Sequence, residues 1–138
     1  MKKLLILSVL LAFSTILLAS NPPEIVTKAF LQKFPKATEI KWSKENSNEW
    51  EASFKLENVT ISANYSNTGE WIETETEIPV SKIPEQVIKS INQSYKGWQI
   101  QGGAIIEKAK SDTVYEVDIK SGISKKEVLY KSDGTLIK

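Results

Sequence analysis

Alternating carboxylates are the residues of this chain best suited to chemistry. Glu73, Glu75 and Glu77 are separated by single residues, and Trp71 stands two positions before the first of them. Alternate side chains of a strand point to the same side, so these four residues predict an acidic row with an aromatic anchor. Such a row suits a basic partner, a small ligand or a cation. The alternative interpretation is a solvated edge strand that its charges protect from aggregation.

Most enzymatic chemistry lacks its usual residues. The chain has no His and no Cys, and all 18 basic residues are Lys. The common general base, the thiol nucleophile and the usual zinc ligands are therefore missing. Neighbouring Ser and Lys, as in Ser81-Lys82 and Ser43-Lys44, are expected by chance in a chain rich in both. No spacing singles out a carboxylate pair for glycoside hydrolysis.

Cofactor binding is not predicted either. The only paired glycines, Gly102-Gly103, lie within an expected strand, where a bulge is the ordinary interpretation and a phosphate loop is not. Residues 20–79 hold 6 Lys and 10 acids, a net charge of −4, whereas residues 80–138 hold 10 Lys and 7 acids, a net charge of +3. This split predicts a dipolar surface without the basic stripe that nucleic acid requires. We predict a protein with no enzymatic activity, no cofactor and no nucleic-acid partner.

The first residues carry the marks of a secretion signal. Met1-Lys2-Lys3 precede an apolar run from Leu4 to Leu18, and Ala19 is the expected end of the signal. The run is short for a membrane span, although an uncleaved anchor is the alternative. Since no Cys follows the run, a lipoprotein is excluded. We predict an exported protein, periplasmic or secreted, that meets the membrane only through residues 1–19.

Two helices are expected after the signal. Prolines open both segments, at Pro23 and Pro84, where a missing backbone N–H costs nothing. Apolar residues then recur at helical spacing. The pattern predicts helices near residues 23–34 and 84–95, each with an apolar stripe narrow enough to lie on a sheet.

The remaining residues alternate as strands do. Folding a hairpin at Glu57-Asn58 pairs apolar with apolar residues on one face: Leu56 with Val59, Phe54 with Ile61, Ala52 with Ala63 and Trp50 with Tyr65. A second hairpin at Gly122-Ile123 pairs Val117 with Val128 and Tyr115 with Tyr130. First strands are expected near 39–43 and 98–109, and last strands after the loops 66–69 and 131–134.

The two segments look like copies of one unit. The segment that starts at Pro23 aligns with the segment that starts at Pro84, at an offset of 61. The segment that starts at Trp50 aligns with the one that starts at Tyr115, at an offset of 65. We therefore predict an α+β fold with two tandem helix-plus-four-strand repeats, residues 20–79 and 80–138. Together they would form one compact domain: an eight-stranded antiparallel sheet with both helices on one face.

A family resemblance rests on two stretches of the second unit. Tyr115-Glu116-Val117-Asp118-Ile119, and Tyr130 followed by the Asp133-Gly134 turn, come after a helix ending in an aromatic residue. This arrangement resembles the PepSY-like family of exported bacterial proteins, also described as β-lactamase-inhibitor-like. The resemblance covers nearly all the mature chain, although Asn67-Thr68-Gly69 departs from the Asp-Gly turn. It implies the tandem fold of β-lactamase inhibitor proteins, and related PepSY domains restrain peptidases, but no inhibitory residue carries over.

We predict a protein-binding module for a partner in the cell envelope, such as a hydrolase that it inhibits or assists in a chaperone-like way. Because the helices cover the apolar side, the polar side of the sheet is the expected contact surface. Its residues are Glu49, Glu51, Ser53, Lys55, Thr60, Ser62, Asn64, Glu116 and Asp118. The alternative is a small-ligand or cation-binding protein that uses the row of Trp71, Glu73, Glu75 and Glu77. A third alternative is an envelope protein with a mechanical or stress-related role.

Overall fold

A computed structural model describes residues 21–137. The predicted signal peptide therefore lies outside the described residues. The elements follow one another as α1 (Glu24–Lys33), β1 (Thr38–Asn46), β2 (Glu49–Leu56), β3 (Val59–Ser66), β4 (Trp71–Ile78), the 3-10 turn η1 (Val80–Lys82), α2 (Glu85–Ser94), β5 (Gln99–Lys108), β6 (Ser111–Ser121) and β7 (Ser124–Tyr130). Neither helix of the described residues has the length or apolar character needed to span a membrane.

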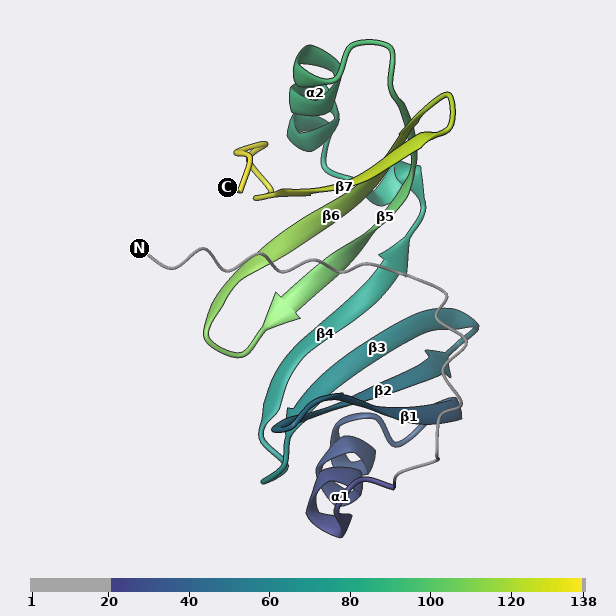
Figure 1. Ribbon diagram of the computed structural model, residues 1–138, viewed down its shortest axis with the longest axis vertical. Coiled ribbons are helices and arrows are strands. Elements are labelled where there is room, and N and C mark those ends of the chain that lie inside the picture. Colours follow the sequence, from purple (N-terminus) through teal and green to yellow (C-terminus); the bar gives the residue numbers. More distant parts are fainter. Residues whose placement is uncertain (1–20, 138) are drawn as a thin grey trace.

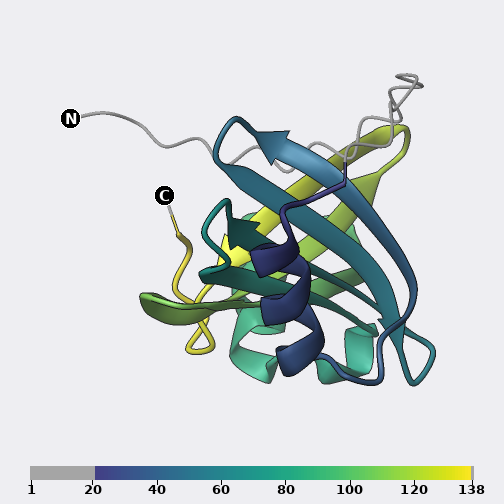
Figure 2. The same ribbon diagram turned by 90° about the horizontal axis from the view of Figure 1, so that it is seen from below.

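The strands form one antiparallel sheet in which neighbours in sequence are neighbours in space. The order is β1-β2-β3-β4-β5-β6-β7, and the sheet is strongly twisted along the long axis of the molecule (Figure 1). Helix α1 lies beside the first strands and α2 beside the last, as the view from below also shows for α1 (Figure 2). The α+β fold with an antiparallel sheet and two helices is confirmed.

Both helices begin and end as their sequences predict. Pro23 and Pro84 are the N-caps, and the acidic residues Glu24 and Glu85 occupy the first turns, where they complement the helix dipole. Val26 and Phe30 of α1 are buried, as are Val87 and Ile91 of α2. Each helix thus places one narrow apolar stripe on the sheet.

Register shows that the two helices cover the same side. Ala63 lies opposite Thr74, Thr76 opposite Ile105, and Gly103 opposite Val117. Residues opposite each other in a ladder share a face. The α1 core and the α2 core are therefore two separate clusters on the same side of the sheet, and Val117, Ile119, Val128 and Tyr130 pack in the second.

The hairpin registers are confirmed, whereas the number of strands is not. All four predicted pairs around Glu57-Asn58 form, and both turn residues have positive φ. Tyr115 pairs with Tyr130 and Val117 with Val128. The bulge expected near Gly102 is present as a register shift between Ile100 and Gly102.

The predicted eighth strand is wrong, because among the described residues only an isolated bridge, Leu136 with Tyr130, follows the Gly134 turn. The corresponding β4 is held between β3 and β5, whereas this C-terminal segment has β7 alone beside it. Four strands thus follow α1 and three follow α2, so the prediction of two equal repeats is not supported. The division at residue 79 stays a prediction.

Candidate functional site

The side of the sheet without helices carries the predicted partner-contact residues of the first half. The ladder places Glu51 opposite Asn64, and Asn64 opposite Glu73. By alternation along β2 and β3, one face holds all of the predicted residues of these strands: Glu49, Glu51, Ser53, Lys55, Thr60, Ser62 and Asn64.

The predicted residues of the second half lie on the same face. Glu77 of β4 is opposite Ala104 of β5, and Ala104 is opposite Glu116 of β6. Asp118 follows Glu116 by two residues and points to the same side. The two parts of the predicted set therefore belong to one surface that crosses the whole sheet.

The predicted row around Trp71 is divided. A register shift occurs between Asn64 and Tyr65, so that Asn64 faces Glu73 while Tyr65 faces Trp71. The indole consequently packs on the helix side, where its Nε1 donates a hydrogen bond to Thr74 Oγ1 at 2.9 Å. Lys33 of α1 lies over its ring at 4.0 Å. Trp71 is part of the core edge of α1 and does not stand beside the three glutamates.

Glu73, Glu75 and Glu77 instead join the predicted partner-contact surface. Glu127 joins them too, because β7 places it opposite Asp118. Glu127 was not among the predicted site residues, although the predicted pair of Val117 with Val128 places it opposite Asp118, one pair further along the ladder. We call the assembled set the acidic face: Glu51, Glu73, Glu75, Glu77, Glu116, Asp118 and Glu127.

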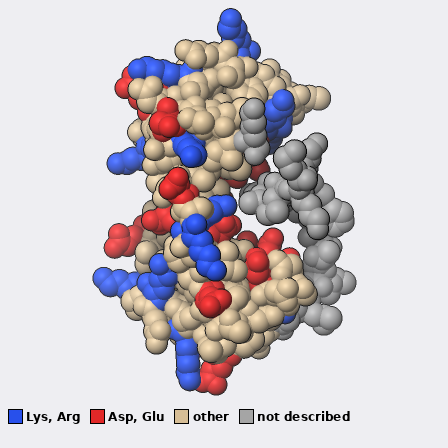
Figure 3. Space-filling view, turned by 90° about the vertical axis from the view of Figure 1, so that its left-hand side faces the viewer, with Lys and Arg blue, Asp and Glu red and all other residues tan. Residues whose placement is uncertain are grey.

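An apolar floor lies within the acidic face. Ala104 and Ile106 of β5 point to the helix-free side, opposite Glu77 and Glu75 respectively, yet they are only 3% and 6% exposed. Seen from one side, the molecule has two lobes with a narrower waist between them, where acidic and basic side chains both occur (Figure 3). The carboxylates thus surround buried apolar surface, which lowers their access to water.

Few cations balance this charge. Among the described residues, only Glu73 of the acidic face has a lysine within ion-pair distance, Lys108 at 3.5 Å. Glu51 accepts a hydrogen bond from Ser53 Oγ at 3.2 Å. Lys120 and Lys125 face each other two pairs beyond Asp118 and Glu127, towards the hairpin end. The centre of the face is therefore negative, with lysines at its end.

Burial and mutual repulsion raise the pKa values of the central carboxyls. Burial raises the pKa of Glu75 to about 7, and the charges of Glu73 and Glu51 add to the shift. Burial likewise raises the pKa of Glu116 to about 8, with Glu75 and Glu127 contributing next. Both groups are thus partly protonated near neutral pH. Carboxylates that are buried and repel one another are stabilised most by a bound cation that replaces the proton.

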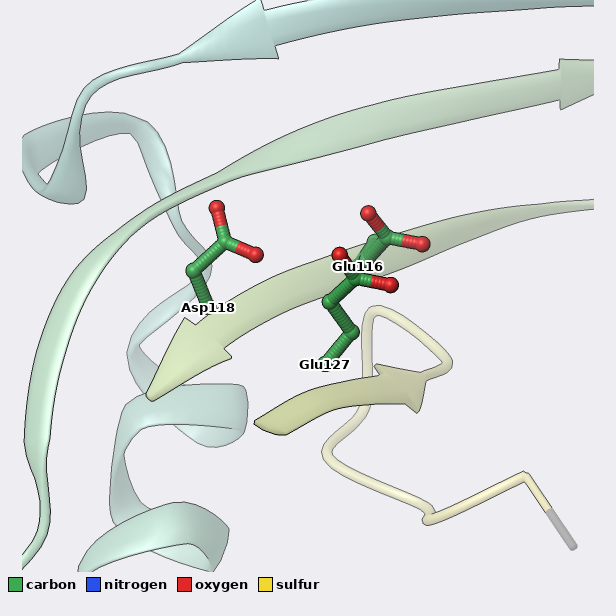
Figure 4. Close-up of side chains that lie close together, drawn as sticks. All are labelled: Glu116, Asp118 and Glu127. Atoms are coloured by element: carbon green, nitrogen blue, oxygen red, sulfur yellow. The ribbon is translucent and has the colours of Figure 1, made fainter. Parts of the chain in front are cut away.

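Three of these carboxylates converge at the β6–β7 end. One oxygen each from Glu116, Asp118 and Glu127 can lie within 4.8 Å of the others, and the close-up shows all three side chains gathered on one side of the two strands (Figure 4). Chemically, the acidic face offers hydrogen-bond acceptors and negative charge around an apolar floor. It suits ammonium groups and hard metal ions.

Comparisons with known proteins match the chain to one family. Residues 48–138, more than half of the chain, match the family described as "Putative beta-lactamase-inhibitor-like, PepSY-like". No curated protein matches the sequence.

Solved structures with the same fold come from Bacteroides species. A putative periplasmic protein of Bacteroides eggerthii is 17% identical, with a TM-score of 0.78 over 86% of this chain and 88% of that one. A BLIP-like protein of Bacteroides fragilis is 22% identical, with a TM-score of 0.73 over 86% of this chain and 85% of that one. At these identities the likeness shows the fold alone.

Proposed function

Since the chain belongs to the PepSY-like family, described as beta-lactamase-inhibitor-like, we propose that it is an exported, non-catalytic module that binds a protein of the cell envelope. The acidic face is the proposed contact surface, and the partner presents lysines or arginines to it. A hydrolase restrained by this contact is the first partner to test, because the family description and the BLIP-like neighbour both refer to an inhibitor. Export agrees with the N-terminal signal and with the neighbour described as periplasmic.

The observation that carries this proposal is the crowding of seven carboxylates over an apolar floor with one ion pair among the described residues. Like charges placed opposite one another in a sheet destabilise it, as Asp118 and Glu127 do. An arrangement that costs folding free energy and leaves its charges uncompensated is typical of a surface that a partner completes.

Affinity capture from an envelope extract tests the proposal. The purified mature protein is compared with a double variant, Glu51→Lys with Glu77→Lys, which reverses two charges of the face. The matched control reverses two exposed charges elsewhere, Glu57→Lys in the β2–β3 turn and Glu107→Lys on the other side of β5. We expect one basic protein to be retained by the wild type and the control and lost by the face variant.

Salt and activity measurements sharpen this result. Retention through charge should weaken as salt rises, since screening shortens the reach of exposed charges to about 8 Å at physiological ionic strength. If the retained protein is a hydrolase, its turnover should fall on adding wild-type protein and not on adding the face variant. Equal retention by all three proteins would contradict the acidic face as the contact surface.

The alternative of a ligand row anchored by Trp71 loses its anchor, because that indole packs against the α1 core. Cation binding by the glutamates does not depend on Trp71.

A further inference from the structure

We infer that Glu116, Asp118 and Glu127 form a binding site for a divalent cation, and that Ca²⁺ is the ion their oxygens fit best. The inference goes beyond the proposed function, because it requires no protein partner. It also concerns three carboxylates at one end of the acidic face and not the row that sequence analysis singled out.

The positions of the three residues follow from the sheet. Asp118 of β6 and Glu127 of β7 are directly opposite each other in the ladder, and Glu116 precedes Asp118 by two residues on the same face. One carboxylate oxygen from each lies within 4.8 Å of the other two. Oxygen ligands stand at about 2.3–2.6 Å from Ca²⁺, so two ligands of one ion are separated by about 5 Å at most. The three oxygens thus have about the spacing of ligands on one ion, and rotation of the exposed Glu127 side chain would bring all three within reach of it.

Glu116 supplies the second observation. It is 8% exposed, and among the described residues its carboxylate has neither a hydrogen bond nor an ion pair. No side-chain hydrogen bond or ion pair within residues 21–137 involves it. Its side chain lies with those of Asp118 and Glu127, on the side of β6 and β7 where they gather (Figure 4). A carboxyl buried without a partner either stays neutral or takes up a cation, and a divalent ion that displaces the proton would supply the partner that the described chain does not.

The neighbouring strand keeps the site open to an ion. On the acidic face β5 presents Gly102 opposite Asp118 and Ala104 opposite Glu116, so that no long side chain of β5 fills the space beside the carboxylates. Lys120 and Lys125 lie two pairs further along and form no ion pair with the three acids. Protein oxygens thus occupy one side of the site, and water would complete the coordination shell.

The donor atoms decide the class of ion. All three are carboxylate oxygens, which favour Ca²⁺, Mg²⁺ or Mn²⁺ over the softer ions that prefer nitrogen or sulfur. Mg²⁺ requires near-ideal octahedral geometry at about 2.0–2.1 Å, whereas Ca²⁺ accepts irregular shells. Two opposed strands with unequal side chains provide an irregular set. With three protein ligands, the affinity should resemble that of extracellular modules, a dissociation constant of about 0.1–1 mM.

Calorimetric titration with CaCl₂ tests the site on the metal-free mature protein. We expect one Ca²⁺ per chain and a rise in melting temperature at saturating Ca²⁺. Glu116→Gln and Asp118→Asn should each weaken binding by about tenfold or more, because each removes a charged ligand. Glu107→Gln is the matched control: this acid of β5 lies opposite Thr74 on the other side of the sheet, and its variant should bind as the wild type does.

Glu127→Gln is a second ligand variant that should fold even if Glu116→Gln does not. Glu127 is exposed, so its replacement disturbs no core. Absence of heat and of a melting shift with the folded wild type would overturn the proposal, as would unchanged affinity in folded Glu127→Gln and Glu116→Gln proteins. Tighter binding of Mg²⁺ than of Ca²⁺ would overturn the choice of ion. Because Glu51→Lys with Glu77→Lys leaves the three ligands intact, loss of the protein partner and loss of Ca²⁺ binding are distinguishable.

Discussion

The two sides of the sheet are built from alternate residues of the same strands, yet they reach burial by different means. On the helix side, Phe30 is 1% exposed because its ring packs against those of Phe54, at 4.9 Å, and Trp42, at 5.3 Å. On the other side, no helix among the described residues covers Ile106 and Glu116, and both are nevertheless buried.

The helix side of the sheet stabilises the fold, whereas the acidic side is suited to binding. Apolar groups that a helix covers stabilise the fold at any pH, because their contribution is the removal of apolar surface from water. Carboxylates that the sheet partly shields contribute little or even unfavourably, because their charges lose water without gaining partners. Substitutions on the first side should therefore change stability most, and those on the second side should change its dependence on pH.

Removing the central ring of the helix side should have the largest effect. Phe30→Ala should lower the free energy of unfolding by about 3–5 kcal/mol, the usual cost of a buried aromatic cavity. Urea denaturation measures the loss. Leu31→Ala on the same helix, at a residue 51% exposed, is the control and should cost far less. A similar loss in both variants would mean that α1 is held by something other than its buried face.

The acidic face should make the protein more stable in mild acid than in mild base. The charges around Glu75 are Glu51 of β2, Glu73 and Glu77 of β4, Glu116 of β6 and Glu127 of β7, with Lys108 of β5 paired to Glu73.

The pKa of Glu75 is about 7 in the folded protein and is taken as 4.5 unfolded. Between these values the folded state keeps a proton that the unfolded state has lost, so the free energy of unfolding falls as pH rises from about 4.5 to about 7. At 1.36 kcal/mol per pKa unit, the difference between 4.5 and about 7 corresponds to about 3.4 kcal/mol, and solvent screening of this partly exposed group lowers the expected loss to about 2–3 kcal/mol.

Glu75→Gln should remove much of this dependence and raise stability at pH 8. Denaturation at pH 5 and pH 8 in chelator-containing buffer measures it, and the chelator keeps any bound cation from masking the repulsion. A wild type whose stability is constant over this range would contradict the repulsion that the face predicts.

Gly103 of β5 packs closely against the backbone of β6, and its replacement should have an intermediate effect on the free energy of unfolding. A Cβ at this position would lie 2.3 Å from the carbonyl oxygen of Glu116 on β6. Gly103→Ala must therefore push β6 away from β5, at a cost of about 1–3 kcal/mol. If the inferred Ca²⁺ site exists, the same shift should weaken Ca²⁺ binding. Gly102→Ala, whose Cβ would meet only the Ile78 carbonyl at 3.7 Å, is the matched control.

The smallest effect on the free energy of unfolding is expected from replacing Lys108, the lysine that is paired on the acidic face. Lys108→Gln removes the ion pair with Glu73, in which both side chains are about three-quarters buried. We expect a loss of about 1 kcal/mol at pH 8, where the neighbouring Glu75 is charged because its pKa is about 7, and a smaller loss at pH 5, where Glu75 is protonated. Denaturation at the two pH values measures the difference. An equal loss at both would show that Lys108 acts through packing of its aliphatic stem.

Local sequence was enough to predict the helices and the hairpins. The apolar stripe of α1 and its flanking prolines act over a few residues, and so does the alternation around Glu57-Asn58. A one-residue slip in that hairpin would expose Phe54 and bury its charged neighbours, so only one register was consistent. The face that carries Glu51 and Glu116 was predicted for the same reason.

Three features depended on contacts distant in sequence. The register shift beside Tyr65 turns Trp71 to the helix side, and strict alternation from Glu73 cannot reveal it. The eighth strand was expected from likeness to β4, but β4 is held from both sides and the C-terminal segment is not.

The composition of the acidic face is the third such feature. The halves of the chain carry net charges of opposite sign, yet acids of both halves gather on one surface because β4 pairs with β5.

The sequence by itself determined which residues alternate, and hence that Glu116 and Asp118 lie on the polar side of their strand. Only the tertiary structure decided that Glu75 lies near Glu116, residues 41 positions apart in the chain. Alternation assigns a side chain to a face through the geometry of its own strand. The neighbours that it meets on that face, and therefore its pKa and the cations it can bind, depend on the pairing of strands across the sheet.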